Sequence, residues 1–542
     1  MTIEYKHNFP YDKIRDQQQT AIEFAVKNLI EDDKKFVILE CGTGVGKSAI
    51  GYTVAKTLLE NLEDNDDYEN GSYFVTTQKI LQDQYIKDFG DSLNKDMLSI
   101  KSSSNYKCKY YSKNTCADSI QKLRTAERTS RFYKACNAGC IYKIAKRKFI
   151  ESKLGVTNFS YFLTESTFSG GIVPQKVLVV DEAHNLENEI GKFVQFNISE
   201  FFAKNSLHIE MPPIKTQFQS MQWIQKEYLP ALKNKIIDIH LVFKKFSGLK
   251  SKLGSDFEKI SKQVDLLESH SKKMEKFIEI YDKENWVMEI NVLDKNLRRL
   301  EFKPVDVSKL AYDHVFRFGQ KVILMSATIL NHEGFCEQLG IPVDEVSFVS
   351  IPSPFPITNK PVFALPVGKM SAAHIDNTLP KLKNAIEILL AQHPNEKGVI
   401  HAHTFKIAKY LKENIKDKRL LYHTSHNRDK VLNKHIRSRQ PTVLISPSMT
   451  EGVDLKGDLS RFQVICKIPY PYLGDKIVKK RMNKWKWWYS LQTVKTIVQA
   501  VGRSIRSKDD SAITYILDGD WNYFYDKNRE VFPLEFRRSI KR

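Results

Sequence analysis

The chain has 542 residues, of which 42% are hydrophobic, and its 84 Lys and Arg against 64 Asp and Glu give a formal net charge of +20. This length and apolar content let the chain bury several cores, so we expect about three or four domains, and the positive charge favours a polyanionic partner. No stretch reaches the ~18 apolar residues that a membrane span requires, which excludes a membrane-spanning protein.

The opening residues and the cysteines indicate the compartment. The first residues, MTIEYKHNFP, contain no apolar run typical of a signal peptide. We therefore expect a cytoplasmic protein, or a nuclear one, or one in the host cytoplasm if the source is viral. Seven cysteines in such a reducing compartment should form no disulfides, so clustered cysteines are metal ligands or core residues.

The first motif along the chain is a glycine-rich loop after an apolar run. FVILE at 36–40 predicts a buried strand, and CGTGVGKS at 41–48 then fits the phosphate-loop pattern G-x-x-x-x-G-K-[ST], except that Cys41 stands at the first glycine. Small residues let successive backbone N–H groups converge on phosphates, and the helix expected from 47 to 59 presents its positive N-terminal end. Lys47 should reach the β and γ phosphates of ATP, and Ser48 should hold Mg²⁺. The nucleotide-binding residues predicted here are Gly42, Thr43, Gly44, Gly46, Lys47 and Ser48.

A basic segment with four cysteines follows. Residues 101–150 contain 13 Lys and Arg against two acids, together with Cys108, Cys116, Cys136 and Cys140. Four thiolates suit either a [4Fe–4S] cluster or a tetrahedral zinc ion, and the spacing does not decide between them. Aromatic side chains are interleaved with the basic ones, an arrangement typical of a surface that stacks on single-stranded nucleic acid, although some of these rings should pack around the metal.

An acidic box ends the next apolar run. VLVVDEAH at 177–184 predicts a buried strand that ends in Asp181 and Glu182, where carboxylates can face a nucleotide held at a neighbouring strand end. Asp181 should hold Mg²⁺ through water, and Glu182 should orient the attacking water.

The remainder of the chain predicts helices and then a second α/β domain. Apolar residues at 3,4 spacing over 229–243 and 257–281 indicate long packed helices, to which we assign no chemistry. Further buried strands are expected at 322–328, and then at 398–404, 442–448, 462–469 and 512–520 with helices between them. Two α/β domains in tandem are the expected architecture.

Two late segments carry charged or aromatic side chains. QAVGRSIR at 499–506 places Gln499, Arg503 and Arg506 on one face of an expected helix, from which the guanidinium groups could stabilise charge on the γ-phosphate when the two domains close. In RMNKWKWWYS at 481–490, we expect Trp485 and Trp488 to pack against the second domain rather than stack on bases.

Taken in order, the motifs resemble those of the iron–sulfur superfamily 2 DNA helicases of the XPD/DinG group. The resemblance runs from about Arg15 to Asp518. It rests on IRDQQQ at 14–19, ECGTGVGKS at 40–48, TTQKILQDQY at 76–85, SNYKC at 104–108, VTNFSYFL at 156–163, VVDEAHNLE at 179–187, SAT at 326–328, SPFP at 353–356, EGVDLKG at 451–457 and QAVGRSIRS at 499–507.

The resemblance implies an α/β fold of two RecA-like parallel-sheet motor domains, with an inserted iron–sulfur cluster domain and a helical arch domain. The expected boundaries are 1–100, 156–195 and 301–358 for motor domain 1, 101–155 for the cluster domain, 196–300 for the arch and 359–542 for motor domain 2. The resemblance also favours a [4Fe–4S] cluster over zinc, and a pore between cluster domain and arch for one DNA strand.

The resemblance assigns further site residues. Gln18 is implied to lie near the adenine, Thr77 and Gln78 near the strand, and Ser326 and Thr328 to couple hydrolysis to motion. Glu451, Gly452 and Asp454 are implied to link the second motor domain to nucleotide and DNA. The full catalytic set expected is Lys47, Asp181, Glu182, Gln499, Arg503 and Arg506.

The function expected from the sequence is therefore an ATP-dependent DNA helicase that moves 5′ to 3′ on single-stranded DNA and unwinds duplex. Its expected partners are single-stranded and forked DNA, with no membrane, and the motor is expected to be monomeric. The alternative is a nucleic-acid-stimulated ATPase that remodels or clamps nucleic acid, or acts on RNA, without processive unwinding.

Overall fold

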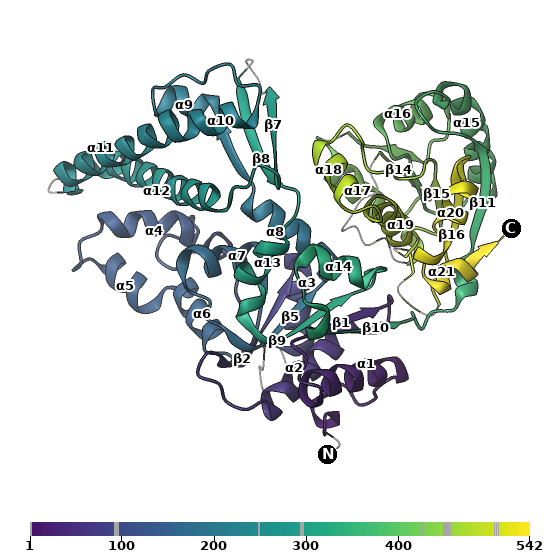
Figure 1. Ribbon diagram of the computed structural model, residues 1–542, viewed down its shortest axis with the longest axis horizontal. Helices are drawn as coiled ribbons and strands as arrows, with labels where there is room; N and C mark the ends of the chain where they lie inside the picture. The colour runs from purple at the N-terminus through teal and green to yellow at the C-terminus, as the bar shows by residue number, and fades with distance from the viewer. Residues whose placement is uncertain are drawn as a thin grey trace.

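The protein is represented by a computed structural model, which describes residues 3–90, 97–247, 250–292, 297–424, 426–447, 455, 457–502, 504–505, 507 and 509–541. Three sheets organise these residues: two seven-stranded parallel sheets and one three-stranded antiparallel sheet (Figure 1). Among the described residues, no helix combines the length and the apolar character needed to cross a membrane.

The first parallel sheet is the centre of motor domain 1. Its strand order is β10-β1-β9-β5-β2-β4-β3. The strands are β1 (Phe36–Cys41), β2 (Glu69–Thr76), β3 (Met97–Ser99), β4 (Leu154–Asn158), β5 (Gln175–Asp181), β9 (Gly319–Ser326) and β10 (Val346–Ile351). All seven residues of β5 are buried, as expected for a parallel strand that is covered on both faces.

Helices cover both faces of this sheet. Alternate residues of β1 enter different cores: Val37 and Leu39 pack with α1 and α2, whereas Phe36 and Ile38 pack with α7, α8, α13 and α14. The helices are α1 (Asp16–Val26), α2 (Lys47–Asn61), α3 (Lys79–Phe89), α7 (Phe159–Thr164), α8 (Leu186–Val194), α13 (Ser308–His314) and α14 (His332–Leu339).

Two inserted segments interrupt the part of the chain that forms this sheet. The cysteine-containing segment runs between β3 and β4 and forms α4 (Cys116–Thr125), α5 (Arg131–Gly139) and α6 (Ile141–Ile150). The second insertion follows α8 and contains the two long helices α11 (Leu229–Ser247) and α12 (Lys250–Ile280), which lie side by side in Figure 1. Its smaller elements are β6 (Phe196–Ser199), α9 (Glu200–Ser206), α10 (Gln217–Trp223), β7 (Trp286–Val292) and β8 (Arg298–Pro304).

We call the second insertion the arch. A helical domain was expected here, but the root of the arch, where it joins motor domain 1, is not helical. Strands β6, β8 and β7 form an antiparallel sheet there. Its apolar face, which includes Trp286 and Phe302, packs on Phe277 of α12. A short sheet can cover the apolar residues that a long helix exposes. The sequence did not predict these strands because they are short and flank strong helical patterns.

The second parallel sheet has the order β13-β14-β12-β15-β16-β11-β17 and forms motor domain 2. Its strands are β11 (Val362–Gly368), β12 (Gly398–His401), β13 (Leu420–Tyr422), β14 (Val443–Ser446), β15 (Phe462–Ile465), β16 (Ile513–Asp518) and β17 (Ile540–Lys541). Its helices are α15 (Ile375–Gln392), α16 (Phe405–Asn414), α17 (Arg428–Arg437), α18 (Lys476–Lys484), α19 (Trp488–Val501), α20 (Trp521–Lys527) and α21 (Leu534–Ser539).

Candidate functional site

The glycine-rich loop joins β1 to α2 and has the backbone that phosphate binding needs. Gly44 and Gly46 have φ values of 89° and 93°, in the left-handed region that side-chain-bearing residues rarely adopt. A side chain at Gly44 would also strike the ring of Phe355, and one at Gly46 would strike the amide of Gln18. Helix α2 begins at Lys47, so its N-terminal end points into the loop.

Gln18, expected near the adenine, is buried beside this loop. Its side-chain oxygen accepts from the backbone N–H of Arg15 at 3.1 Å. The Arg15 guanidinium in turn donates to the carbonyl of Gly44 at 2.8 Å. On the other side, the Ser353 hydroxyl donates to the carbonyl of Thr43 at 2.7 Å. Arg15 and Ser353 thus hold the loop from two directions, a role that the sequence did not assign to them.

The acidic box meets the loop at the ends of the parallel strands. Lys47 Nζ lies 3.9 Å from Glu182 Oε1. Asp181 is buried at the end of β5 and accepts from the hydroxyl of Tyr85 at 3.1 Å. Burial, and then the neighbouring charge of Glu182, raises the pKa of Asp181 to about 6, although Lys47 acts in the opposite direction. A cation bound beside Asp181 would favour its ionised form.

Glu182 has an unusual backbone. Its φ of 53° lies in the left-handed region, which is costly for a residue that is not glycine. The side chain of Glu182 lies near both Lys47 and His184, whose Nδ1 lies 3.2 Å from Glu182 Oε2. Such a carboxylate is held in place before any substrate arrives.

A chain of polar contacts runs from the acidic box to motor domain 2. His184 Nδ1 lies 2.9 Å from the hydroxyl of Ser326, which accepts from the backbone N–H of Thr328 at 3.1 Å. The hydroxyl of Thr328 then accepts from Gln499 Nε2 at 2.9 Å. Beside these contacts, Lys495 of the same helix α19 donates to the carbonyl of His184 at 3.0 Å. The structure therefore brings together Lys47, Asp181, Glu182, Ser326, Thr328 and Gln499.

Five residues expected at this site lie outside the described residues: Glu451, Gly452, Asp454, Arg503 and Arg506. Their predicted roles stay predictions. One structural expectation is wrong, because helix α19 ends at Val501 and Ser504 and Ile505 are not helical, so no single helix carries Gln499 through Arg506. Gly502 is the C-cap residue, and its backbone N–H donates to the carbonyl of Val498 at 3.0 Å.

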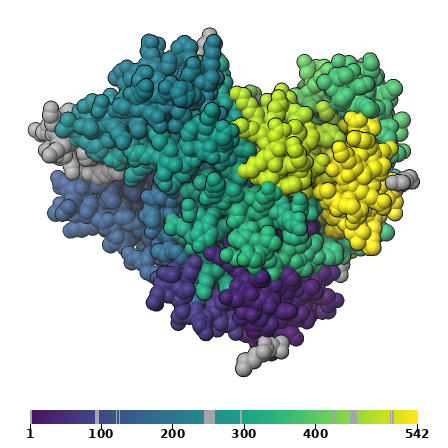
Figure 2. Space-filling model, viewed as in Figure 1, coloured from purple at the N-terminus to yellow at the C-terminus, as the bar shows by residue number. Residues whose placement is uncertain are grey.

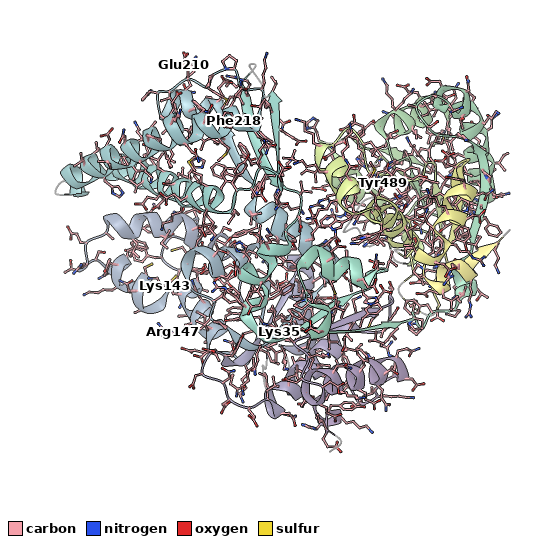
Figure 3. All side chains as sticks on the ribbon, viewed as in Figure 1. Lys35, Lys143, Arg147, Glu210, Phe218 and Tyr489 are labelled. Atoms are coloured by element: carbon pink, nitrogen blue, oxygen red, sulfur yellow. The ribbon has the colours of Figure 1, made fainter. Side chains whose placement is uncertain are left out.

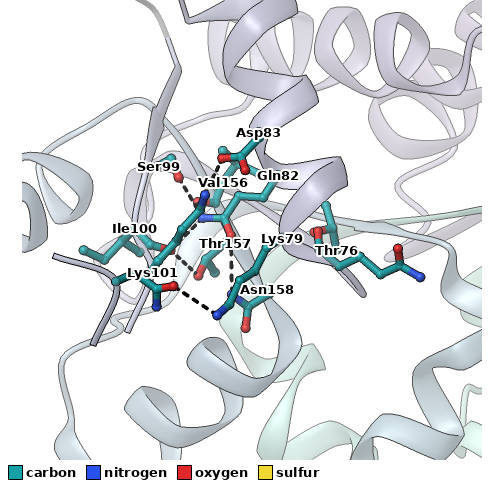
Figure 4. A network of polar contacts seen from close by, with 12 residues as sticks. Thr76, Lys79, Gln82, Asp83, Ser99, Ile100, Lys101, Val156, Thr157 and Asn158 are labelled. Atoms are coloured by element: carbon teal, nitrogen blue, oxygen red, sulfur yellow. Dashed lines mark hydrogen bonds and ion pairs between the residues drawn. The ribbon is translucent and has the colours of Figure 1, made fainter. Parts of the chain in front are cut away.

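The segment expected near the nucleic-acid strand follows β2, which lies between β5 and β4 in the first sheet. Thr76 ends β2, Gln78 is the N-cap of α3, and Thr77 lies between them. Gln82 of α3 is fully buried and donates to the Ser99 hydroxyl and the carbonyl of Ile100, both at 2.7 Å (Figure 4).

Gln82 also ties α3 to the far end of the cysteine segment. Its Nε2 donates to the carbonyl of Val156 at 3.2 Å, and its oxygen accepts from Asn158 at 3.3 Å. On the same helix Asp83 pairs with Lys101 (Figure 4). The chain enters the cysteine segment after β3 and leaves it at β4, so one helix fixes both connections.

The four thiols of the inserted segment lie near one another. Cys116 Sγ is 3.4 Å from Cys140 Sγ. Burial raises the pKa of Cys116 to about 12, and the neighbouring thiols of Cys140, Cys136 and Cys108 raise it further. Burial likewise raises the pKa of Cys136, whereas the pKa of Cys108 is lowered because hydrogen bonds and Lys122 outweigh burial. No three described His, Cys, Asp or Glu side chains are arranged to hold a metal ion.

Aromatic rings of this segment pack on one another. Phe132 is buried and contacts the rings of both Tyr110 and Tyr111 at centroid distances of 5.4 and 4.9 Å. Tyr106 and Tyr142 form a second pair at 5.5 Å. Lys143 and Arg147, labelled in Figure 3, belong to α6 of this segment. Tyr110 remains 49% exposed, so one face of the aromatic cluster is open to a ligand.

Comparisons with known proteins agree with this arrangement. The Helicase C-terminal domain family matches residues 401–532, and the family described as type III restriction enzyme, res subunit, matches residues 12–212. A probable ATP-dependent helicase of Methanocaldococcus jannaschii is 23% identical, over 98% of this chain and 97% of that protein. The ATP-dependent DNA helicase DinG of Photobacterium profundum is 26% identical over 40% of this chain and 34% of its own length.

Solved structures show the same fold. A structure titled XPD helicase has a TM-score of 0.62 at 16% identity, with 96% of this chain and 99% of that chain covered. The structure of S. tokodaii Xpd4 has a TM-score of 0.57 at 13% identity, with 97% and 99% covered. The motifs, the two parallel-sheet motor domains and these relatives together support an ATP-dependent helicase that is similar to the superfamily 2 helicases of the XPD/DinG group.

Proposed function

We propose that this helicase acts on DNA, translocates 5′ to 3′ on a single strand and unwinds duplex ahead of it. The observation that carries the motor part of the proposal is the polar chain from Glu182 to Gln499, because it links the group that would orient water to a helix of the other motor domain. The choice of DNA is supported by the relative named a DNA helicase, and the direction by the resemblance of the motifs.

In this proposal Lys47 binds the β and γ phosphates and the loop amides hold the α and β phosphates. Glu182, already positioned by its backbone and by His184, orients the attacking water. Arg503 and Arg506 then stabilise charge on the γ-phosphate when the motor domains close. Hydrolysis therefore depends on closure, and release of products reopens the domains.

The residues around the loop fit Mg²⁺. The carboxylate of Asp181, buried at the end of β5, and the hydroxyl of Ser48, at the start of α2, are oxygen donors of the kind that this ion prefers. Asp181 and Ser48 would hold it, and the bound ion would neutralise charge on the phosphates.

We propose that the four cysteines bind a [4Fe–4S] cluster rather than a zinc ion. The resemblance of the motifs to those of the iron–sulfur helicases supports the cluster, whereas four thiolates at this spacing suit either group. When bound, the cluster would hold Cys108, Cys116, Cys136 and Cys140 as one rigid unit.

The DNA path in this proposal follows the basic cysteine segment and the arch. The segment carries a local net charge of +11 from 13 basic and two acidic residues. Lys and Arg at this density neutralise phosphates, and an exposed ring such as that of Tyr110 can stack on a base. Helix α4 of the segment contacts α12 of the arch.

An unwinding assay tests the proposal. Duplexes with a 5′ overhang, a 3′ overhang or a fork are mixed with protein and ATP, and strand release is measured. We expect release from the 5′-overhang and forked substrates, and none with Lys47→Ala. Stimulation of ATP hydrolysis by DNA without strand release would support the clamping alternative, and stimulation by RNA alone would support an RNA substrate.

A further inference from the structure

Helix α18 of motor domain 2 binds the root of the arch through basic side chains. Lys476 Nζ donates to the carbonyl of Met288 at 3.3 Å. Lys480 Nζ donates to the carbonyl of Glu284 at 2.9 Å and to that of Trp286 at 3.3 Å. Met288 and Trp286 belong to β7 and Glu284 lies just before it, so α18 holds one strand of the arch sheet.

The end of α18 holds the strand that leaves the arch. Arg481 Nε donates to the carbonyl of Val305 at 2.8 Å, and Lys484 pairs with Asp306. Val305 and Asp306 follow β8, which pairs with β7. Helix α18 therefore contacts the chain on both sides of the β7–β8 pair: just before and within β7, and just after β8.

Arg481 also contacts motor domain 1 at the start of α8, shortly after the acidic box in the sequence. Its guanidinium lies 2.5 Å from Glu187 Oε1, and both side chains are mostly buried. Glu187 lies at the start of α8, five residues after Glu182. Burial raises the pKa of Glu187, and Arg481 opposes that shift by favouring the ionised form.

The four basic residues share one face of α18. Positions 476, 480, 481 and 484 are spaced by four, one and three residues, which places them together on a helix. Asp475 caps the helix by accepting from the backbone N–H of Ile477 at 2.7 Å. Each of the four basic side chains therefore has a protein partner.

The tryptophans after α18 extend the same contact. The indole N–H of Trp485 donates to Glu337 of α14 at 2.9 Å, and the ring of Trp487 lies against Gly334. Trp485 is buried and its polar partner belongs to motor domain 1, whereas its packing against motor domain 2 stays a prediction. Trp488 begins α19, as expected for a residue of motor domain 2, and Tyr489 beside it is labelled in Figure 3.

Figure 1 shows α18 beside β7 and β8, and Figure 2 shows the lime-coloured surface that contains it against the teal surface of the arch and motor domain 1. The arch in turn contacts the cysteine segment through α12 and α4. A continuous set of contacts therefore leads from motor domain 2 through α18 and the arch to the cysteine segment.

We propose that α18 is a clasp that makes the arch follow motor domain 2 when nucleotide closes the two motor domains. This inference rests on the proposed function, since it assigns to the arch a movement that serves strand separation. Lys480, Arg481 and Lys484 are positioning residues, because the contacts that the structure gives them are to protein groups: the backbone at β7, the carbonyl of Val305, Glu187 and Asp306. Through such a clasp, ATP binding and hydrolysis would change the distance between the arch and the cysteine segment.

The test uses a charge exchange in the full-length holoprotein. Lys484→Asp places two carboxylates opposite each other, and the double variant Lys484→Asp with Asp306→Lys restores an ion pair of reversed polarity. Lys479→Ala is the matched control, because it removes a charge from an exposed position of the same helix.

The first readout compares DNA-stimulated ATP hydrolysis with unwinding of a forked duplex. We expect Lys484→Asp to keep hydrolysis within about twofold and to lose about fivefold or more in unwinding, with recovery in the exchanged pair. Equal loss of hydrolysis and unwinding, or no recovery in the exchanged pair at normal iron content, would overturn the clasp.

The second readout does not depend on unwinding. Dyes are placed through unnatural amino acids at Phe218 of the arch and Lys143 of the cysteine segment, both labelled in Figure 3, and energy transfer is measured with a non-hydrolysable ATP analogue. We expect a nucleotide-dependent change in the wild type and in Lys479→Ala, its loss in Lys484→Asp and its return in the exchanged pair. If the wild type shows this change but unwinds nothing, the proposed function fails and the clasp stands; an arch unmoved by nucleotide, or one that moves equally in Lys484→Asp, overturns the clasp.

Discussion

The hydrogen bond between Gln499 and Thr328 gives the sharpest prediction, because it crosses between the motor domains. Thr328→Val removes the accepting hydroxyl and keeps the size of the side chain, and Gln499→Leu removes the donor. A neutral hydrogen bond of 2.9 Å between partly buried groups contributes about 0.5–1.5 kcal/mol. Each single variant should therefore lower kcat/KM for DNA-stimulated ATP hydrolysis by about two- to tenfold.

The double variant distinguishes this bond from two independent effects. If the two side chains act through one bond, Thr328→Val with Gln499→Leu should be no worse than the poorer single variant, with a coupling free energy of about 0.5–1.5 kcal/mol. The assay is steady-state ATP hydrolysis at saturating single-stranded DNA. Losses that simply add, with a coupling free energy near zero, would refute the view that the bond links the domains.

Three other predictions concern separate parts of the molecule. Gln82→Leu should destabilise the first motor domain by about 2–4 kcal/mol, since it leaves several buried polar partners unpaired, and a shift of the urea midpoint would measure this; an unchanged midpoint would contradict the network in Figure 4. The pKa of Asp181 is raised to about 6, so its contribution to the free energy of unfolding of the nucleotide-free protein is present at low pH and is lost as pH rises through about 6. The affinity for Mg²⁺–nucleotide should rise over the same range, because a bound cation favours the ionised carboxylate. Binding of a fluorescent nucleotide that does not change between pH 5 and 7 would contradict this prediction. Cys108→Ser should lose iron and unwinding while basal ATP hydrolysis persists, as checked by an iron and sulfide count, and full unwinding without iron would remove the proposed role of the cluster.

The parallel strands and the nucleotide loop could be predicted because their signals are local. Continuous apolar runs such as 36–39 and 177–180 are typical of strands buried on both faces, and glycines at 44 and 46 are required by a positive φ. The order of the motifs then gave the fold. These features depend on neighbours a few residues away, so the sequence contains them explicitly.

The contacts that the sequence did not reveal join residues that are remote along the chain. Arg481 and Glu187 are separated by 294 residues, and nothing in either local pattern announces the other. A buried ion pair of this kind is specified by the packing of two domains, not by periodicity. The strands at the arch root were missed for a similar reason, because tertiary contacts outweighed a helical pattern. Helix α19 also ends at Val501, earlier than the helical pattern predicts.

The most direct test of the account is an experimental structure with Mg²⁺, single-stranded DNA and a transition-state analogue of ATP. If ATP binds between the closed motor domains, Lys47, Asp181 and Arg503 should surround one phosphate group, with Gln499 still bonded to Thr328. A closed motor in which Arg503 lies remote from that phosphate, or in which the nucleotide binds away from Lys47, would contradict it.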